Sequence, residues 1–179
     1  EINNIVNQYY NQSIFLLPLE KISNSINQLS WAKGVNLSTN FINKLNVEIL
    51  EYKPIGLLFY NNQLFYFTKD GKIIDKYRED SNKSLIIFYG NQAARVAYNF
   101  LIGINKTETV NMIKEAYYIN ERRWDVRLHN DIVLNLSEIN IEDSLKNYIN
   151  LIKKFNYSDI IKIKSIDLRD SEKAIISFK

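Results

Sequence analysis

Apolar residues recur at helical spacing near the start of the chain and then switch to strict alternation. Residues 2–9 and 18–29 place them three or four positions apart, which predicts two amphipathic helices. Residues 35–37 and 45–49 alternate apolar with polar positions, which predicts two half-buried strands joined by a turn over residues 39–43. This helix–helix–strand–strand unit is small, so it needs a partner sheet or a further strand at its front.

A boundary follows at Pro54 and Gly56, because both residue types interrupt regular structure. Short apolar runs dominate beyond it, separated by turn signals at Asn61-Asn62 and Asp70-Gly71. These runs predict strands over residues 57–60, 64–68 and 72–74.

The second half of the chain mixes helical and strand patterns. Residues 92–102 and 141–155 have helical periodicity, and Asn140 is placed to cap the second of these helices. Residues 110–119 fit a helix or a strand equally well by periodicity. The chain closes with two strand-like runs, residues 161–168 and 174–178. Together these segments predict an α+β protein: a small α/β module, then a mostly antiparallel β domain with flanking helices.

The composition is that of a soluble globular protein, with 46% hydrophobic and 24% charged residues among 179. The net charge of +3 is too small and too evenly spread for a nucleic-acid-binding surface. The absence of cysteine excludes disulfides and thiol chemistry. No apolar run approaches the roughly 20 residues that span a bilayer. Because the chain begins with Glu1 rather than Met, we expect an upstream segment, such as a membrane anchor, to have been removed.

The stretch ERRWDVRLHNDIVLNL, residues 121–136, is the best candidate for a catalytic cluster. His129 or Asp125 could transfer protons, and the arginines could clamp a phosphate or carboxylate. However, the charged residues alternate strictly with apolar ones, as in a hairpin with one dry and one wet face. We therefore interpret the charges as the solvated face of that hairpin. Its apolar face comprises Trp124, Val126, Leu128, Ile132, Leu134 and Leu136.

Other catalytic or cofactor-binding patterns are missing from the sequence. One histidine without cysteine does not provide the usual zinc ligands, and the five glycines form no phosphate-binding loop. Serines have no histidine partner at a suggestive spacing, and the carboxylates are scattered. The sequence predicts a binding module with no enzymatic activity, cofactor, metal, small-molecule substrate or nucleic-acid partner.

Four segments in order resemble the FtsQ/DivIB family of bacterial cell-division proteins. They are INQLSWAKGVNLSTNFINKLNVEILEYKPIGLL (residues 26–58), Asp70-Gly71, RRWDVRLHNDIVLNL (122–136) and IKSIDLRDSEKAIISF (163–178). The first segment follows the family pattern through Trp31, Val35, Leu45, Val47, Ile49, Glu51, Pro54 and Ile55. Phe41-Ile42 replaces the family's Trp-Pro, and Asp131 and Ser137 stand where glycines are usual.

The resemblance implies a POTRA module over residues 1–54, with its first strand missing or trimmed, and an FtsQ-type β domain over residues 55–179. It favours a strand over residues 110–119. Family members are bitopic, so this part would lie outside the membrane, in the periplasm, below a single inner-membrane helix upstream of this chain. The implied role is a non-enzymatic scaffold at the septum that recruits FtsB and FtsL, while the POTRA module contacts other division proteins.

A chain that ends in a strand tends to leave an open sheet edge, which can accept a partner strand. The alternative is a last strand that the core covers completely. With the family in view, we expect the last strand and the preceding helix to bind the partner, with two arginines pairing acidic partner residues. The expected partner-binding residues are Arg122, Leu145, Tyr148, Leu151, Ile152, Arg169, Ala174, Ile175, Ile176, Ser177 and Phe178. Within the Asp-Leu-Arg motif we expect Leu168 in the core, with Asp167 or Arg169 paired locally.

Two rival functions remain open at this point. A POTRA-type periplasmic module could instead handle unfolded or outer-membrane polypeptides, and a downstream membrane barrel in the full-length protein would favour that function. An enzyme could use the Arg/Asp/His cluster, in which case replacing His129 and Asp125 would abolish its activity.

Overall fold

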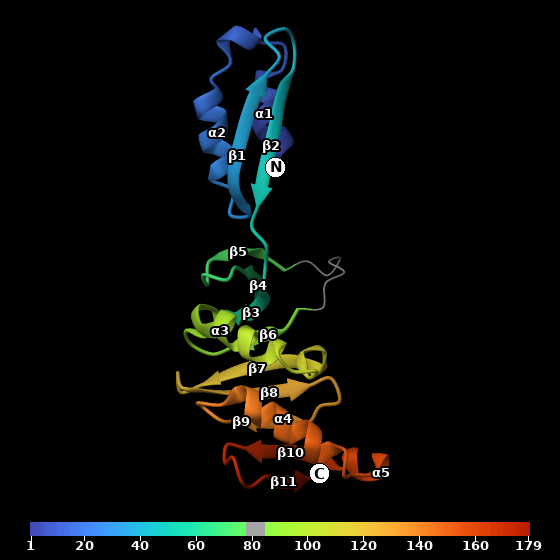
Figure 1. Ribbon diagram of the computed structural model, residues 1–179. Coiled ribbons are helices and arrows are strands. Elements are labelled where there is room, and N and C mark those ends of the chain that lie inside the picture. The colour runs from blue at the N-terminus through green and yellow to red at the C-terminus, as the bar shows by residue number, and fades with distance from the viewer. Residues whose placement is uncertain (78–84) are drawn as a thin grey trace. The chain divides into compact units, whose positions relative to one another are not determined.

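The computed structural model describes residues 1–77 and 85–179 and divides the chain into two compact units. Unit 1 comprises residues 1–53 and unit 2 residues 54–179. The division falls directly before Pro54, one residue earlier than the boundary that the sequence suggested. Figure 1 labels the elements of both units.

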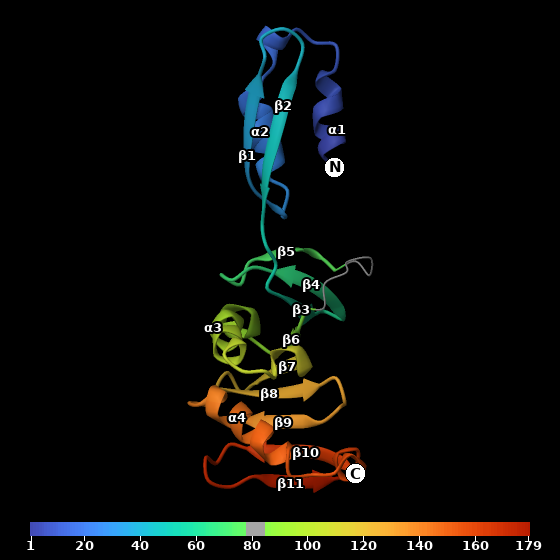
Figure 2. The ribbon, with the colours of Figure 1, turned by 45° about the vertical axis from the view of Figure 1, so that its right-hand side comes forward.

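Unit 1 contains two α-helices, two short 3-10 helices and one antiparallel hairpin (Figure 2). Its elements are α1 (Ile2–Val6), η1 (Asn7–Tyr9), η2 (Ile14–Leu16), α2 (Leu19–Asn27), β1 (Ala32–Thr39) and β2 (Leu45–Glu51). Ile22 and Ile26 project from α2 into a small core, where Ala32 of β1 meets them. The predicted order of helices and strands is confirmed, although the first α-helix ends at Val6 and continues as a 3-10 turn.

Unit 2 is built on a sheet of nine described strands in the order β11-β10-β9-β8-β7-β6-β3-β4-β5. The strands are β3 (Gly56–Tyr60), β4 (Gln63–Phe67), β5 (Ile73–Lys76), β6 (Ile87–Tyr89), β7 (Ile113–Ile119), β8 (Arg123–Leu128), β9 (Val133–Leu136), β10 (Ile163–Leu168) and β11 (Ile175–Phe178). The helices are α3 (Ala93–Asn105), η3 (Val110–Met112), α4 (Ile141–Ile152) and α5 (Tyr157–Ile160).

Most neighbouring strands of this sheet run antiparallel, which confirms the predicted α+β class. The parallel pairs are β3–β6, β6–β7 and β9–β10. Helix α3 connects β6 to β7, and α4 connects β9 to β10, because a parallel pair needs a long crossover. Both helices cover the same face of the sheet and contact each other (Figure 1).

An aromatic cluster fills the core between α3 and the sheet. The Phe88 ring lies edge-on to Phe67, Phe100 and Trp124, with ring centroids 5.4, 6.1 and 5.6 Å apart. Such pairs contribute about 0.5–1.5 kcal/mol each beyond the area they bury. Trp124 therefore has the core position that alternation in the hairpin predicted.

The turns use the residues that their backbone requires. Asn61 and Asn62 have φ values of 48° and 57°, and Gly71 has 76°, as expected for tight hairpin turns. Asp131 has φ 66°, so it adopts the conformation that a glycine would supply at this position of the family pattern.

Several sequence predictions need correction. Helix α4 ends at Ile152 rather than residue 155, and its preceding residue Asn140 makes no side-chain capping bond, because its ψ of 68° lies outside the usual cap conformation. Strand β10 begins at Ile163 rather than residue 161, because the short helix α5 precedes it. Strand β6, which is only three residues long, was not predicted as a strand.

Candidate partner-binding edge

Strand β11 forms one edge of the sheet in unit 2 (Figure 1). Among the described strands it pairs only with β10, antiparallel, with Asp167 opposite Ile175, Ile166 opposite Ile176 and Ser165 opposite Ser177. Alternate residues of such an edge strand direct their N–H and C=O groups away from the sheet. The outer side of β11 is therefore a template for one more strand.

The side chains of β11 are largely exposed. Ile175 is 67% and Phe178 53% exposed, and Ser177 and the preceding Ala174 are exposed as well. Ile176, between Ile175 and Ser177, is half-buried and packs against the core. The core therefore does not cover the last strand, and the edge presents apolar groups to solvent.

Several hydrogen bonds fix the hairpin that carries β11. Lys179 N–H donates to the Lys162 carbonyl over 2.8 Å, and its Nζ donates to the Ile161 carbonyl over 3.0 Å. At the other end, Asn147 of α4 donates to the Ser171 carbonyl over 3.3 Å. The edge is therefore held in place before any partner binds, which lowers the ordering cost of binding.

Ser144 attaches the first turn of α4 to the strands beneath it. Its buried Oγ accepts the Ser137 N–H over 3.0 Å and lies 3.1 Å from the carbonyl oxygens of both Asn140 and Leu168. These contacts connect the end of β9, the start of α4 and the end of β10. Ser144 thus holds the first turn of α4 against the ends of β9 and β10.

The expected partner-binding residues of α4 divide into two pairs. Leu145 and Tyr148 are 0% and 4% exposed and belong to the core, because this face of α4 packs on β9 and β10. A direct partner contact therefore does not fit these two residues. Leu151 and Ile152, in the last turn, are half-buried and border the core.

Arg169 and Asp167 form a bidentate ion pair at the end of β10. The Arg169 Nε lies 2.9 Å from Oδ1 and its Nη2 2.5 Å from Oδ2 of Asp167. The Arg169 guanidinium lowers the pKa of the Asp167 carboxyl, and the carboxylate raises the pKa of Arg169. Leu168 between them is buried, so the predicted roles of this motif are confirmed.

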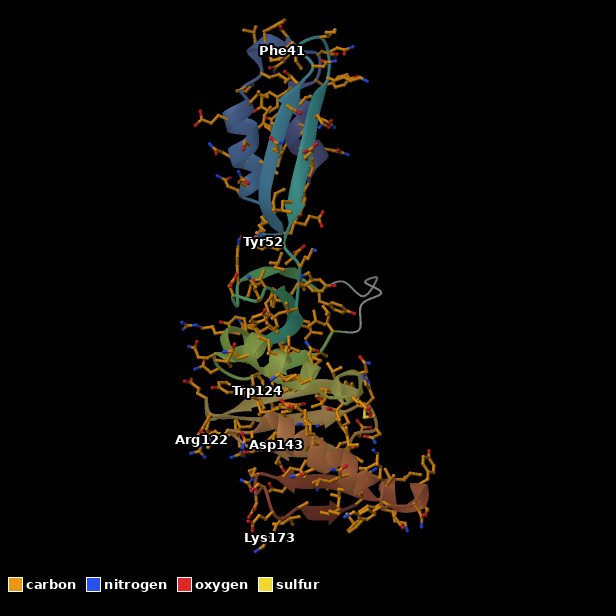
Figure 3. The ribbon with its side chains drawn as sticks, in the orientation of Figure 1. Phe41, Tyr52, Arg122, Trp124, Asp143 and Lys173 are labelled. Atoms are coloured by element: carbon orange, nitrogen blue, oxygen red, sulfur yellow. The ribbon has the colours of Figure 1, made fainter. Side chains whose placement is uncertain are left out.

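Arg122 precedes β8 and pairs with Glu138, which follows β9, with Nε and Oε2 3.2 Å apart. The antiparallel β8–β9 and parallel β9–β10 pairings put the start of β8 and the end of β10 at the same end of the sheet. Arg122 and Arg169 therefore belong to one end of unit 2, together with the hairpin turn that carries Lys173 (Figure 3).

The charged residues of the supposed catalytic stretch do not converge on a common point. Arg123 pairs with Asp125 at 3.4 Å, Arg127 pairs with Glu115 of β7 at 3.3 Å, and His129 is exposed beyond the end of β8. The alternation predicted this wet face. Within residues 1–77 and 85–179, no group of three His, Cys, Asp or Glu residues is arranged to hold a metal ion.

Sequence reasoning missed two contributors to this edge. Ser144 shares the inward face of α4 with Leu145 and Tyr148, and that position is the signal that could have found it. Glu138, the partner of Arg122, lies in a loop without periodicity, so no sequence pattern pointed to it.

The fold and the edge define a class: a small α/β module joined to a sheet domain that ends in an open terminal strand. The family "Cell division protein FtsQ/DivIB, C-terminal" matches residues 58–169, and "POTRA domain, FtsQ-type" matches residues 1–52. The chain therefore belongs to the FtsQ/DivIB family. Strand β11 lies beyond the matched residues.

Curated relatives support the same family. The cell division protein FtsQ of Rickettsia typhi is 31% identical over 173 residues, which cover 96% of this chain and 64% of that protein. FtsQ of Rhizobium radiobacter is 24% identical over 168 residues, which cover 92% of this chain and 78% of that protein. This chain thus spans about two thirds of the Rickettsia protein. No helix among the described residues is long and apolar enough to cross a bilayer.

Proposed function

We propose that this protein is a non-enzymatic scaffold of the bacterial division machinery that binds a partner strand along β11. Its partners would be bitopic division proteins of the FtsB and FtsL type at the septum. The main support is the edge itself: β11 is terminal in the sheet, anchored at both ends and lined by exposed apolar side chains.

The geometry of strand addition follows from the register of β11. A new strand would gain main-chain hydrogen bonds from the outward groups of β11, and its side chains would alternate between the two sheet faces. On one face they would meet Ile175 and Ser177. On the helix-covered face they would meet Ile176. Helix α4 leads from the end of β9 to the start of β10, so Leu151 and Ile152 in its last turn lie towards the end of β11 that carries Phe178.

The arginines at the hairpin end of the sheet supply the electrostatic part of the proposal. Arg122 is 61% and Arg169 52% exposed, so both guanidiniums can approach an acidic segment while their present partners stay in place. Rim charges of this kind raise the association rate and fix the register more than they raise affinity.

The family also supports a location for this scaffold. We place the chain on the outer side of the cytoplasmic membrane, in the periplasm, as part of a single-pass protein whose membrane helix precedes it. Unit 1 would contact other division proteins. Fusion of a fluorescent protein that matures only in one compartment would test the location separately from partner binding.

Substitutions on β11 test the strand-addition proposal. Ile175→Pro and Ile176→Pro form an informative pair, because adjacent residues of a strand direct their N–H groups to opposite sides. One proline removes a hydrogen bond to the partner, and the other removes one to β10. The variant whose proline removes an N–H that points away from β10 should bind the extracytoplasmic segment of an FtsB-type protein at least about tenfold more weakly. Its melting temperature should be unchanged.

A charge on the same edge provides a second test with a matched control. Ile175→Lys introduces the charge that natural edge strands use to block pairing, whereas Ile73→Lys adds it at a 43% exposed site of β5, at the other edge of the sheet. Isothermal titration should show weaker binding for Ile175→Lys alone. Equal affinities for Ile175→Lys, Ile73→Lys and the unmodified chain would refute strand addition.

A further inference from the structure

Unit 1 carries a concentrated apolar patch at one end, which we call the tip: the loops over residues 10–17 and 40–44. Five large apolar side chains there are 70–79% exposed: Tyr10, Phe15, Leu16, Phe41 and Ile42. Elsewhere in residues 1–53, Leu50 is the one further exposed large apolar side chain. Figure 3 shows Phe41 at the end of unit 1 away from Tyr52.

The tip is held in a defined conformation. Asn40 Oδ1 accepts hydrogen bonds from the N–H groups of Ile42, Asn43 and Lys44 over 3.0, 2.9 and 2.8 Å. Phe41 has φ 56°, an unfavourable left-handed conformation for a bulky residue. Such strain persists only where the surrounding contacts impose it, and it is concentrated at functional sites. The loop thus holds two apolar side chains outward at an energetic cost.

The two loops form one surface. The rings of Phe15 and Phe41 stack with centroids 6.4 Å apart, joining residues from the two loops. Beside them a hollow is lined by residues of both loops and by residues of α1, η1 and β2. The apolar groups of the lining are Val6, Tyr9, Tyr10, Ile14, Phe15, Leu17, Ile42 and Leu45.

The tip is almost free of charged residues. Residues 2–17 contain no charged side chain, and Lys44 is the one charge in residues 38–47. The remaining polar groups are Asn, Gln, Ser and Thr, and the first acidic residue after the first loop is Glu20 in α2. A surface with exposed aromatic and aliphatic groups, neutral polar neighbours and a single cation matches the interface of an anionic lipid bilayer.

We propose that the tip of unit 1 inserts into the headgroup region of an anionic membrane. Tyr10, Phe15 and Phe41 enter the boundary between headgroups and acyl chains, where the amphipathic ring of Tyr and the apolar ring of Phe are both favoured. Lys44 meets the lipid phosphates. This contact uses residues of unit 1 alone, so it is independent of partner binding at β11.

Flotation of the 179-residue chain with vesicles tests this contact. Vesicles of phosphatidylcholine containing phosphatidylglycerol should carry the chain upward, and vesicles of phosphatidylcholine alone should carry less of it. The double variant Phe15→Ser/Phe41→Ser should lose at least about tenfold in partitioning, since each ring contributes apolar burial. The matched control Ile139→Ser/Tyr157→Ser removes two apolar groups of unit 2 that are at least as exposed as Phe15 and Phe41, and it should bind like the unmodified chain.

Two further measurements test the charge and the depth of the lipid contact separately. Lys44→Gln should weaken binding about fivefold on anionic vesicles and leave binding to neutral vesicles unaffected. Phe41→Trp should add tryptophan fluorescence that shifts to the blue when vesicles are added. Circular dichroism verifies that each variant is folded.

The following results would overturn the proposal: no flotation with either vesicle, flotation that the double variant retains, or an unshifted Phe41→Trp spectrum. Self-association of the chain that the double variant abolishes, without flotation, would assign the tip to a second copy of the chain instead. Failure here leaves the β11 proposal intact, because that proposal is tested with a soluble partner.

Discussion

Replacement of Ser144 by alanine removes the hydroxyl that joins α4 to the sheet. The Ser137 N–H then loses its acceptor at 3.0 Å, and the Asn140 and Leu168 carbonyls lose the nearby donor. An unsatisfied buried polar group costs about 1–3 kcal/mol. Ser144 is 3% exposed, so water cannot easily take its place. We expect the free energy of unfolding of unit 2 to fall by about 2 kcal/mol.

Thermal and urea unfolding measure this loss. For a unit of this size, about 2 kcal/mol lowers the melting temperature by roughly 6–10 °C. Ser158→Ala, at an exposed position of α5, is the control and should change stability by less than about 0.5 kcal/mol. Ser144→Ala should also weaken partner binding, because α4 carries Leu151 and Ile152 beside the edge. Unchanged stability of Ser144→Ala, or equal losses in both variants, would refute the role of Ser144.

Two further predictions concern charge and packing. The Asp167 pKa is lowered from its ordinary value of 3.8, so its ion pair stabilises the fold above that pH and loses this effect as the pH falls through the lowered value. Because Arg169 is half exposed, Asp167→Asn should lower the free energy of unfolding by less than about 1 kcal/mol at neutral pH. The difference in stability between this variant and the unmodified chain should vanish in unfolding curves measured in acid. Gly56→Ala places a Cβ 2.6 Å from the Phe88 ring and should cost about 1–3 kcal/mol in urea unfolding. The Cβ that Gly103→Ala adds within α3 has no atom within 4 Å, so this substitution should raise the free energy of unfolding by up to about 1 kcal/mol. A greater loss of stability for Gly103→Ala than for Gly56→Ala would contradict the packing argument.

Alternation was the most informative pattern in the sequence. In β8 and β9 a period of two assigned Trp124 and Leu134 to the core and Asp125 to the wet face, because one face of the sheet is covered by helices. The Asn61-Asn62 turn was equally predictable, since few residue types tolerate positive φ at two consecutive positions.

Elements that depend on distant contacts could not be predicted. Strand β6 has three residues and is stabilised by two parallel neighbours, β3 and β7, which local propensity does not reveal. Leu145 and Tyr148 were expected at a partner surface, because helical periodicity shows which residues share a face but not what covers that face. The strained Phe41 was visible only as a departure from a family pattern.

Amide hydrogen exchange across β11 tests the central proposal most directly. The chain would be compared alone and with the extracytoplasmic segment of an FtsB-type protein, and exchange would be followed in a C-terminal peptide covering residues 174–179. We predict that the outward N–H groups of Ile175–Phe178 exchange quickly in the free chain and become protected in the complex, while β5 at the other edge stays unchanged. Tight binding without added protection in β11 would contradict strand addition.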